Sequence, residues 1–313
     1  MGYWSIPLIV ILALAVIFFA TICICFFKIF YSFRRKEKEE YPIPAGKAYE
    51  PHRDQMVKWI KNARELPHTD VSITSFDGLK LRGKYYQHSP DAPIEILFHG
   101  YKGTSERDLS GGIYRCFKLG HNALIVDHRA SGNSEGRIIT FGAKESRDCV
   151  DWVNFVINNI NKDSKIIITG ISMGAATVMM AASMELPENV IGVLADCGYT
   201  STKDIIKKVM RDMKLPADLL YPFARLSAKM FGGFDPDKSS PIESMKKCRL
   251  PVIFYHGDVD GFVPCYMSEQ NFDACASERK RLVIIEGADH GLCFPVDIKK
   301  YIDELDAFFP SEK

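Results

Sequence analysis

The chain has 313 residues, which is enough for one large α/β domain with a single buried core after an apolar N-terminal segment is set apart. Its 40 Lys and Arg residues nearly balance its 39 Asp and Glu residues, which excludes the basic surplus typical of nucleic-acid-binding proteins. The nine cysteines show no CxxC spacing, which argues against a zinc site or a disulfide framework and favours reduced thiols in a reducing compartment.

An uncharged and mostly apolar segment runs without interruption from Ile6 to Phe27. About 22 residues at roughly 1.5 Å each reach ~33 Å as a helix, enough to cross the hydrocarbon core of a bilayer. A cleaved signal peptide is the alternative, but no charged side chain precedes the segment and it ends in Phe-Phe-Lys rather than at a small-residue cleavage site. Myristoylation at Gly2 is disfavoured, since Ile6 stands where Ser or Thr is expected. We therefore expect residues 1–33 to be a transmembrane anchor with its flanks.

The charges that flank this segment predict its orientation. No Lys or Arg precedes it, whereas five basic residues follow it, namely Lys28, Arg34, Arg35, Lys36 and Lys38. The positive-inside rule therefore places the rest of the chain in the cytoplasm, in agreement with the cysteine usage. Aromatic residues at both ends suit the interfacial belts of a single-pass membrane protein: Tyr3 and Trp4 before the segment, Tyr31 and Phe33 after it.

Residues 34–69 are interpreted as a charged linker followed by a short amphipathic helix around Trp59. The pattern then changes to two alternating segments, Val71–Phe76 and Leu79–Tyr86, on either side of the turn dipeptide Asp77-Gly78. This arrangement predicts an antiparallel β-hairpin.

From residue 94 onward, short apolar runs alternate with segments of helical length. The expected strands are Ile94–Phe98, Ala123–Val126, Lys165–Thr169, Ile191–Asp196, Val252–Tyr255 and Leu282–Ile285. The expected helices lie near residues 105–119, 143–160, 173–184, 265–277 and 295–309. Continuous apolar strands alternating with helices predict a parallel sheet covered on both faces. With the hairpin, residues 70–313 should form an α/β domain around a mostly parallel sheet of eight strands.

One strand connection is longer than a single helix requires. Roughly 54 residues separate Asp196 from Pro251, about twice the length of a one-helix crossover. The excess, about residues 200–232, is expected to form a short helical cap over the carboxyl edge of the sheet, where open α/β sheets bind ligands.

The pentapeptide Gly170-Ile-Ser-Met-Gly174 directly follows an apolar strand and opens a helix of small residues. This context is typical of a nucleophile elbow, a strained turn whose flanking residues must pack closely and are therefore glycines. The turn would present the Ser172 hydroxyl at a helix N-terminus, where developing negative charge is stabilised. The alternative is an ordinary glycine turn with Ser172 as a helix N-cap.

A serine nucleophile needs a base, and in this fold the acid and the histidine follow the serine along the chain. The loops after the last two strands offer candidates for both. One loop carries His256, Asp258 and Asp260, and the other carries Asp289 and His290.

Three motifs in this order resemble the α/β-hydrolase superfamily: Gly170–Gly174, His256-Gly-(x)2-Asp-(x)2-Val-Pro264 and Gly287-Ala-Asp-His-Gly291. The resemblance covers residues 70–310 and is nearest to membrane-anchored, single-domain members grouped with serine-aminopeptidase-like and depalmitoylase-like hydrolases. It implies Asp260 as the triad acid, with Asp258 as the rival, and His290 as the base. The alternative bases are less suitable, because His256 opens its loop too early and His99 and His128 precede Ser172.

The oxyanion hole of such an enzyme requires two main-chain amides, one of them from the residue after the nucleophile, here Met173. His99-Gly-Tyr101 resembles the oxyanion loop of the family, which implies the Tyr101 amide as the second donor. The segment from Asp127 to Ser134 resembles the family's Asp-x-Arg-Gly-x-Gly-x-Ser turn, but Ala130 stands where Gly is usual. We interpret that segment as structural.

The predicted function is that of a serine hydrolase, which cleaves carboxylic ester or thioester bonds through an acyl-enzyme and requires neither a metal nor an organic cofactor. The anchor and the apolar cap favour acyl-chain or lipid substrates. The alternatives are a serine peptidase acting on short peptides and a non-catalytic binding module. The cap itself has two interpretations: an amphipathic lid with a solvated basic face, or a lid whose basic face lies near anionic lipid headgroups.

Overall fold

The structure is a computed structural model that describes residues 5–33 and 39–310. Two groups of residues used in the membrane prediction lie outside these ranges. They are Tyr3 and Trp4 of one interfacial belt, and the basic Arg34, Arg35, Lys36 and Lys38.

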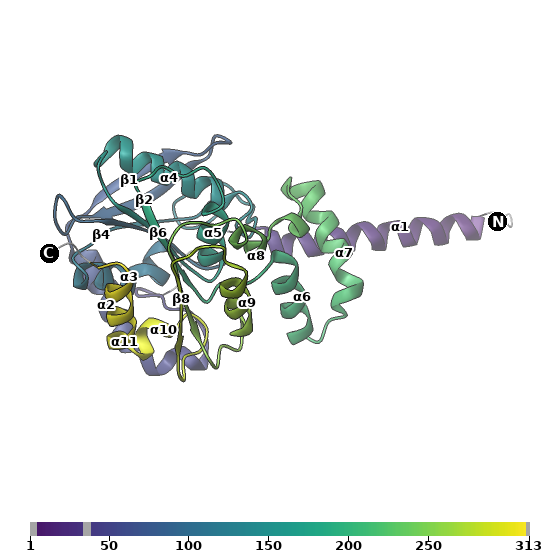
Figure 1. The fold of residues 1–313 in the computed structure, drawn as a ribbon. Helices are drawn as coiled ribbons and strands as arrows, with labels where there is room; N and C mark the ends of the chain where they lie inside the picture. The colour runs from purple at the N-terminus through teal and green to yellow at the C-terminus, as the bar shows by residue number, and fades with distance from the viewer. Residues whose placement is uncertain (1–4, 34–38, 311–313) are drawn as a thin grey trace.

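An eight-stranded sheet forms the centre of the domain, in the order β1-β2-β4-β3-β5-β6-β7-β8 (Figure 1). Strands β1 and β2 form the predicted antiparallel hairpin, β2 pairs antiparallel with β4, and the other neighbours are parallel. The strands are β1 Thr69–Thr74, β2 Lys80–Tyr86, β3 Ile94–Phe98, β4 Asn122–Val126, β5 Ile166–Ile171, β6 Val190–Asp196, β7 Val252–Gly257 and β8 Lys280–Ile285. The predicted fold class is confirmed.

The register of the parallel strands aligns their carboxyl ends. Phe98 at the end of β3 pairs with Gly170 of β5, and Asp196 at the end of β6 pairs with Tyr255 of β7. Every residue of β3 and β4 is buried, as continuous apolar strands under helices on both faces require. The loops that follow β3, β5, β7 and β8 therefore meet at one edge of the sheet.

Helices cover both faces of this sheet. One face packs against α4 (Glu145–Asn159), α5 (Met173–Ala181), α8 (Pro241–Met245) and α9 (Tyr266–Ala274), with Trp152 of α4 among the largest fully buried side chains. The other face packs against α2 (Arg53–Glu65), α3 (Ser105–Lys118), α10 (Cys293–Val296) and α11 (Ile298–Phe308). Both cores are built from the apolar stripes that the helix periodicity predicts.

The N-terminal helix α1 (Ser5–Cys25) continues as a π-helical turn η1 (Phe26–Phe30) and projects from the domain (Figure 1). Within Pro7–Phe30, an 18-residue window has a mean hydropathy of 3.2, so by length and composition this segment is able to cross a membrane. The side chains from Pro7 to Ala20 are exposed. This exposure fits an apolar helix that meets lipid rather than a protein core.

The carboxyl end of the N-terminal helix is built into the domain. Phe30 is completely buried and its carbonyl accepts a hydrogen bond from the Ile139 amide (2.8 Å). The next residues continue the attachment, because Tyr31 forms an antiparallel bridge with Ile138 and the Ser32 amide donates to the Arg137 carbonyl (2.8 Å). The helix therefore leaves the domain from a fixed point.

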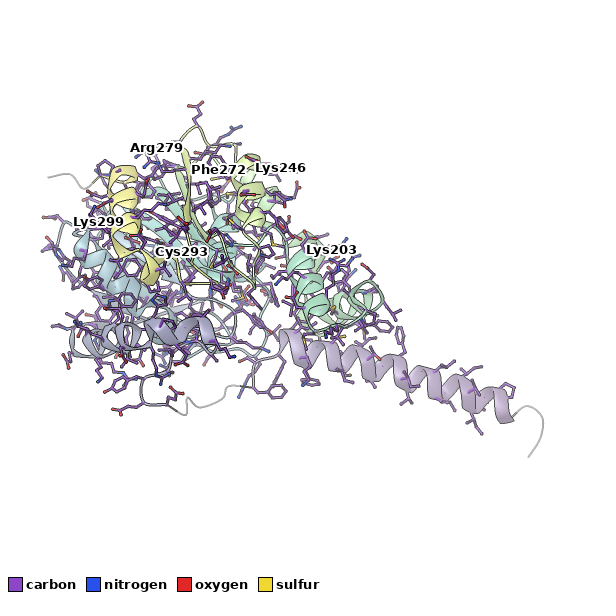
Figure 2. The ribbon with its side chains drawn as sticks, turned by 90° about the horizontal axis from the view of Figure 1, so that it is seen from below. Lys203, Lys246, Phe272, Arg279, Cys293 and Lys299 are labelled. Carbon is purple, nitrogen blue, oxygen red and sulfur yellow. The ribbon has the colours of Figure 1, made fainter. Side chains whose placement is uncertain are left out.

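The segment predicted as the cap contains the helices α6 (Thr202–Asp212) and α7 (Ala217–Ser227) and the π-helical turn η3 (Ala228–Gly232). They lie beside the part of α1 that is nearest to the domain, and the N-terminal part of α1 projects beyond them (Figure 1). Figure 2, in which Lys203 marks α6, shows the same arrangement from below. The cap therefore packs against the N-terminal helix as well as against the rest of the domain.

Candidate active site

The turn at Ser172 connects β5 directly to α5. Its backbone is strained, with φ 56° and ψ −114° at a residue that is not glycine. Gly170 and Gly174 allow the turn to close: a Cβ atom on Gly170 would lie 2.1 Å from the Gly174 carbonyl carbon, and one on Gly174 would lie 2.0 Å from the Phe98 carbonyl oxygen. The flanking glycines are thus required by close packing, as the predicted elbow demands.

Three side chains from separate loops lie in one hydrogen-bonded line. The Ser172 Oγ atom lies 3.0 Å from His290 Nε2, and His290 Nδ1 lies 2.8 Å from Asp260 Oδ2. Asp260 follows β7 and His290 follows β8, so the aligned strand ends bring together residues that lie up to 118 positions apart. This geometry permits proton transfer from a hydroxyl to an imidazole that a carboxylate orients.

The Asp260 carboxylate is held from two sides. Its Oδ1 atom accepts hydrogen bonds from the amides of Phe262 (2.8 Å) and Val263 (2.7 Å), and its Oδ2 atom also lies 3.2 Å from His256 Nε2. Burial alone would raise the pKa of Asp260, but the hydrogen bonds from His256 and His290 outweigh it and hold this pKa well below its usual range. Asp260 therefore remains a carboxylate when it faces His290.

The rival acid and the alternative bases lie elsewhere. Asp258 is exposed and accepts a hydrogen bond from the Gly287 amide (2.7 Å), away from the imidazole of His290. His256 is completely buried between Ser268 Oγ (2.6 Å) and the Val263 carbonyl (2.8 Å). It supports the loop of Asp260 and does not reach the serine.

The other two alternative bases, His99 and His128, connect the loops after β3 and β4. His99 Nε2 accepts a hydrogen bond from the His128 amide (3.0 Å), so the proton of this imidazole is on Nδ1, which donates to the Gly100 carbonyl (2.7 Å). Burial lowers the pKa of both imidazoles, and they remain neutral. They fix the position of the loop that contains Tyr101.

Two main-chain amides are available beside the serine. A Cβ atom built on Gly100 would lie 3.5 Å from the Ser172 Cβ, so the loop after β3 approaches the elbow closely. Among the described residues, neither the Tyr101 amide nor the Met173 amide donates to another protein group. Both amides are therefore free to meet an oxyanion formed at Ser172.

Comparisons with known proteins agree with this geometry. Residues 96–224 match the sequence model of a family described as alpha/beta hydrolase fold. The esterase Pf2001 of Pyrococcus furiosus has the same fold, with a TM-score of 0.65 at 23% identity over 79% of this chain and 94% of that chain. The chain therefore has the α/β-hydrolase fold.

Two curated sequences also resemble this chain. YqkD of Bacillus subtilis is 26% identical over 251 residues, which cover 80% of this chain and 81% of that protein. The thiohydrolase aneE of Aspergillus aculeatus is 30% identical over 128 residues, which cover 40% of each protein. The first of these extends the likeness over most of the chain, whereas the second is limited to less than half of it.

A cleft of about 600 Å³ opens beside Ser172. One wall is formed by residues 44–49, which sequence analysis assigned to a linker. From this segment Tyr49 donates a hydrogen bond to the main-chain carbonyl of His290 (2.7 Å). No motif marks Tyr49, and only its proximity to His290 in space reveals its role.

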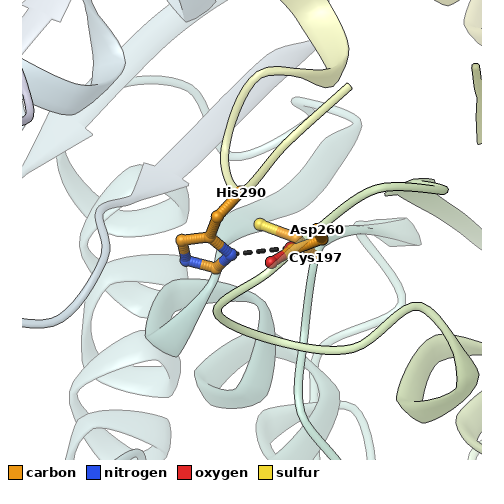
Figure 3. A group of neighbouring side chains, drawn as sticks. All are labelled: Cys197, Asp260 and His290. Atoms are coloured by element: carbon orange, nitrogen blue, oxygen red, sulfur yellow. Dashed lines mark hydrogen bonds and ion pairs between the residues drawn. The ribbon is translucent and has the colours of Figure 1, made fainter. Parts of the chain in front are cut away.

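The buried thiol of Cys197 lies close to Asp260 and His290. The ligand atoms of Cys197, Asp260 and His290 lie within 4.8 Å of one another (Figure 3). Burial raises the pKa of the Cys197 thiol well above its usual range, and a protonated thiol is a poor metal ligand. Since Asp260 and His290 already bond to each other, the cluster does not fit a metal centre.

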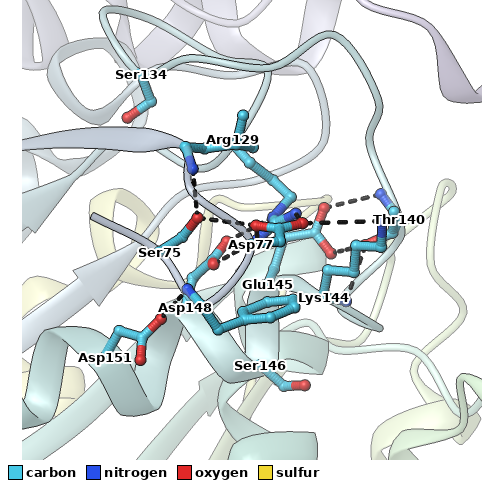
Figure 4. A network of polar contacts seen from close by, with 12 residues as sticks. Ser75, Asp77, Arg129, Ser134, Thr140, Lys144, Glu145, Ser146, Asp148 and Asp151 are labelled. Atoms are coloured by element: carbon cyan, nitrogen blue, oxygen red, sulfur yellow. Dashed lines mark hydrogen bonds and ion pairs between the residues drawn. The ribbon is translucent and has the colours of Figure 1, made fainter. Parts of the chain in front are cut away.

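The turn after β4 supports the domain through Arg129. Its guanidinium bonds to Asp148 of α4 (2.7 Å and 2.6 Å) and to Asp77 of the hairpin turn (2.8 Å and 3.0 Å) (Figure 4). Ala130, which replaces the usual Gly, adopts the left-handed φ of 63° that explains the family preference. The contacts are structural, as the sequence predicts for this segment.

Proposed function

We propose that the hydrolase cleaves carboxylic ester or thioester bonds by covalent catalysis, with Ser172 as nucleophile, His290 as general base and Asp260 as the triad acid. The observation that carries the proposal is the unbroken hydrogen-bonded line from Ser172 Oγ to Asp260. A serine is inert without such a base, and an isolated imidazole lacks a defined tautomer.

In the first step His290 Nε2 takes the Ser172 proton as the hydroxyl oxygen attacks the acyl carbon. The carbonyl oxygen becomes an oxyanion and accepts hydrogen bonds from the amides of Tyr101 and Met173. His290 then protonates the leaving alcohol or thiol, and the C–O or C–S bond breaks to leave an acyl group on Ser172. A water molecule, deprotonated by His290, releases the acid and restores the serine.

The substrate class is supported by the surroundings of the serine. Apolar side chains of Met56, Tyr101, Ile171 and Phe262 contribute to the cleft. Two similar proteins are an esterase and a thiohydrolase, which favours ester and thioester chemistry. Charged residues also line the cleft, namely Lys47, Arg107, Asp108 and Asp289. The apolar side chains and the names of these relatives together support an acyl-chain substrate, which is our proposal.

We also propose that α1 anchors the hydrolase in a membrane as a single span, with the catalytic domain in the cytoplasm. The support is the length and hydropathy of Pro7–Phe30 together with the basic residues that follow it in the sequence. Protease protection of the full chain in inverted and right-side-out vesicles tests the orientation.

Activity-based labelling tests the catalytic assignment. The Ser172→Ala variant should lose fluorophosphonate labelling and esterase turnover while its circular dichroism spectrum remains that of the wild type. Ser131→Ala is the matched control, because Ser131 is also a buried loop serine and should remain irrelevant to labelling. Persistent labelling of Ser172→Ala would refute the nucleophile, and faster turnover of amino-acid anilides than of p-nitrophenyl acyl esters would favour a peptidase.

A further inference from the structure

The described part of α1 that is clear of the domain is too short by itself to cross a bilayer. This part begins at Ser5, and its first ring contact with the cap is that of Phe18 with Phe223 (centroids 5.3 Å apart). About 13 residues precede this contact, and they reach only ~20 Å at 1.5 Å per residue. The hydrocarbon core is about 30 Å thick, and any tilt of the helix increases the length that it needs.

The missing length must come from the stretch that packs against the cap. Ile22 is almost completely buried, and Phe231 of η3 contacts both Phe19 (6.5 Å) and Phe26 (5.2 Å). The first charged side chain after the span is Lys28, which lies about 15 Å along the helix from Phe18. If the span is complete, hydrocarbon therefore extends to the level of α7 and η3.

The outer surface of the cap is apolar, as this position requires. Helix α7 buries Ala217, Tyr221 and Ala224 against the domain, whereas Leu219 on its other side is 65% exposed. Outside residues 7–33, five of the ten exposed large hydrophobic residues of the described chain belong to the cap: Met213, Leu215, Leu219, Met230 and Phe231. A water-facing lid would not concentrate such residues on its outer face.

Several charged residues of the cap form ion pairs, either within the cap or with the segment that follows it. Arg225 contacts Asp235 (2.8 Å) and Asp237 (2.9 Å), and Lys207 contacts Asp218. Pairing reduces the cost of placing charges close to hydrocarbon. The cap therefore combines an apolar outer face with several paired charges and a surplus of basic residues, which is the composition of an element that lies within a membrane interface.

We propose that α7 and η3 are inserted into the leaflet from which α1 emerges, with lipid acyl chains covering Leu219, Met230 and Phe231. The proposal depends on the proposed membrane anchor and adds the source of the substrate to the proposed function. On the domain side, Lys208 of α6 donates to the Gly261 carbonyl, in the loop that also carries Asp260. The inserted cap thus adjoins the catalytic loop, and acyl groups held in the same leaflet are the substrates within reach.

Quenching by brominated lipids tests the insertion in the full-length protein. Leu219→Trp and Met230→Trp variants are reconstituted into phosphatidylcholine vesicles with plain or dibrominated acyl chains. The emission that each new Trp adds to the wild-type spectrum should be blue-shifted in plain vesicles and mostly lost in brominated vesicles. Met184→Trp is the control, because Met184 is 39% exposed and follows the end of α5 that points away from the catalytic edge.

The outcomes separate the insertion from the anchor and from the enzyme. Carbonate extraction of the same vesicles reports the anchor, and fluorophosphonate labelling confirms that each variant is folded. If the protein stays in the vesicles after carbonate extraction but the emission of the new Trp is equal in plain and brominated vesicles, the insertion is overturned and the anchor is not. Release by carbonate would overturn both the anchor and the insertion, while labelling of Ser172 would be unaffected. Loss of emission in the Met184→Trp control as well would also contradict a specific insertion of the cap.

Discussion

Tyr49 and His290 are 241 positions apart in the chain, yet the Tyr49 hydroxyl donates a 2.7 Å hydrogen bond to the His290 carbonyl. Tyr49 follows the N-terminal helix and lines the cleft, so the segment after the anchor supports the main chain of the proposed base. Burial raises the pKa of Tyr49, which keeps the phenol protonated as a donor. This contact connects the region of the anchor to the catalytic loop.

Removal of the Tyr49 hydroxyl should slow catalysis without unfolding the protein. The Tyr49→Phe variant loses one hydrogen bond worth about 1 kcal/mol, which corresponds to a roughly fivefold lower kcat if it positions His290 in the transition state. Steady-state hydrolysis of a p-nitrophenyl ester measures this effect, with KM and the unfolding midpoint close to the wild type. Tyr266→Phe, at an exposed position on α9, should behave as the wild type. An equal loss in both variants would contradict the positioning role.

The two candidate acids should differ strongly on mutation. Asp260→Asn keeps the shape of the side chain but presents an amide to His290 Nδ1, which disfavours the productive tautomer. We expect kcat to fall roughly a thousandfold or more. Asp258→Asn should change kcat by less than about twofold, because that exposed carboxylate bonds only to the Gly287 amide. A larger loss for Asp258→Asn than for Asp260→Asn would reverse the assignment.

The pair of Asp77 and Arg129 should contribute to stability in a defined pH range. The Arg129 hydrogen bonds lower the pKa of Asp77 from 3.8 to about 2. Because the folded pKa is depressed, this stabilisation is present above about pH 4 and is lost as the pH falls from 4 to 2. About 1 kcal/mol is expected once solvent screening of the partly exposed carboxylate is allowed for.

Chemical unfolding of the full chain in detergent between pH 2 and 7 measures this contribution. The Asp77→Asn variant should have a smaller loss of unfolding free energy below pH 4 than the wild type. Asp91→Asn, in an exposed turn, should follow the wild-type curve. If the unfolding free energy falls equally below pH 4 in the wild type and in Asp77→Asn, the role of this ion pair is refuted.

Lys214 occupies a position that favours glycine. It has φ 58° immediately after α6, where the Leu215 amide bonds to the Met210 carbonyl (2.9 Å) and the Lys214 amide to the Arg211 carbonyl (2.8 Å). Lys214→Gly should therefore stabilise the domain by about 0.5–1 kcal/mol, measured by thermal unfolding. Lys203 lies within the first turn of α6, so Lys203→Gly should instead destabilise the domain. Destabilisation by Lys214→Gly would show that the lysine side chain itself stabilises the cap.

Local patterns in the sequence predict much of this fold and of the candidate site. The apolar runs predicted at Ile94–Phe98 and Lys165–Thr169 are strands in the structure, the second as Ile166–Ile171, because continuous burial needs continuous apolar residues. Ser172 and the candidate loops follow strands, and parallel strands end at one edge of the sheet. The choice of Asp260 over Asp258, and of His290 as the base, is instead what the resemblance to a known family implies.

Contacts between distant segments were not predictable in the same way. The position of β2 beside β4 follows from packing of the whole sheet rather than from any residue in the hairpin. Tyr49 stands in a segment without regular periodicity, so its approach to His290 has no local signature. The packing of Phe18 on Phe223 likewise depends on where the cap folds back.

The backbone pairing of Tyr31 with Ile138 and of Ser32 with Arg137 has a further consequence for an anchored enzyme. A catalytic domain on a flexible linker would adopt all orientations relative to the membrane and would meet dissolved substrates at random. If α1 spans a membrane as proposed, this pairing joins the span to the domain, so the opening of the cleft keeps one height and one orientation above the bilayer. Turnover of a lipid substrate should then depend on its mole fraction in the membrane rather than on its concentration in the surrounding water.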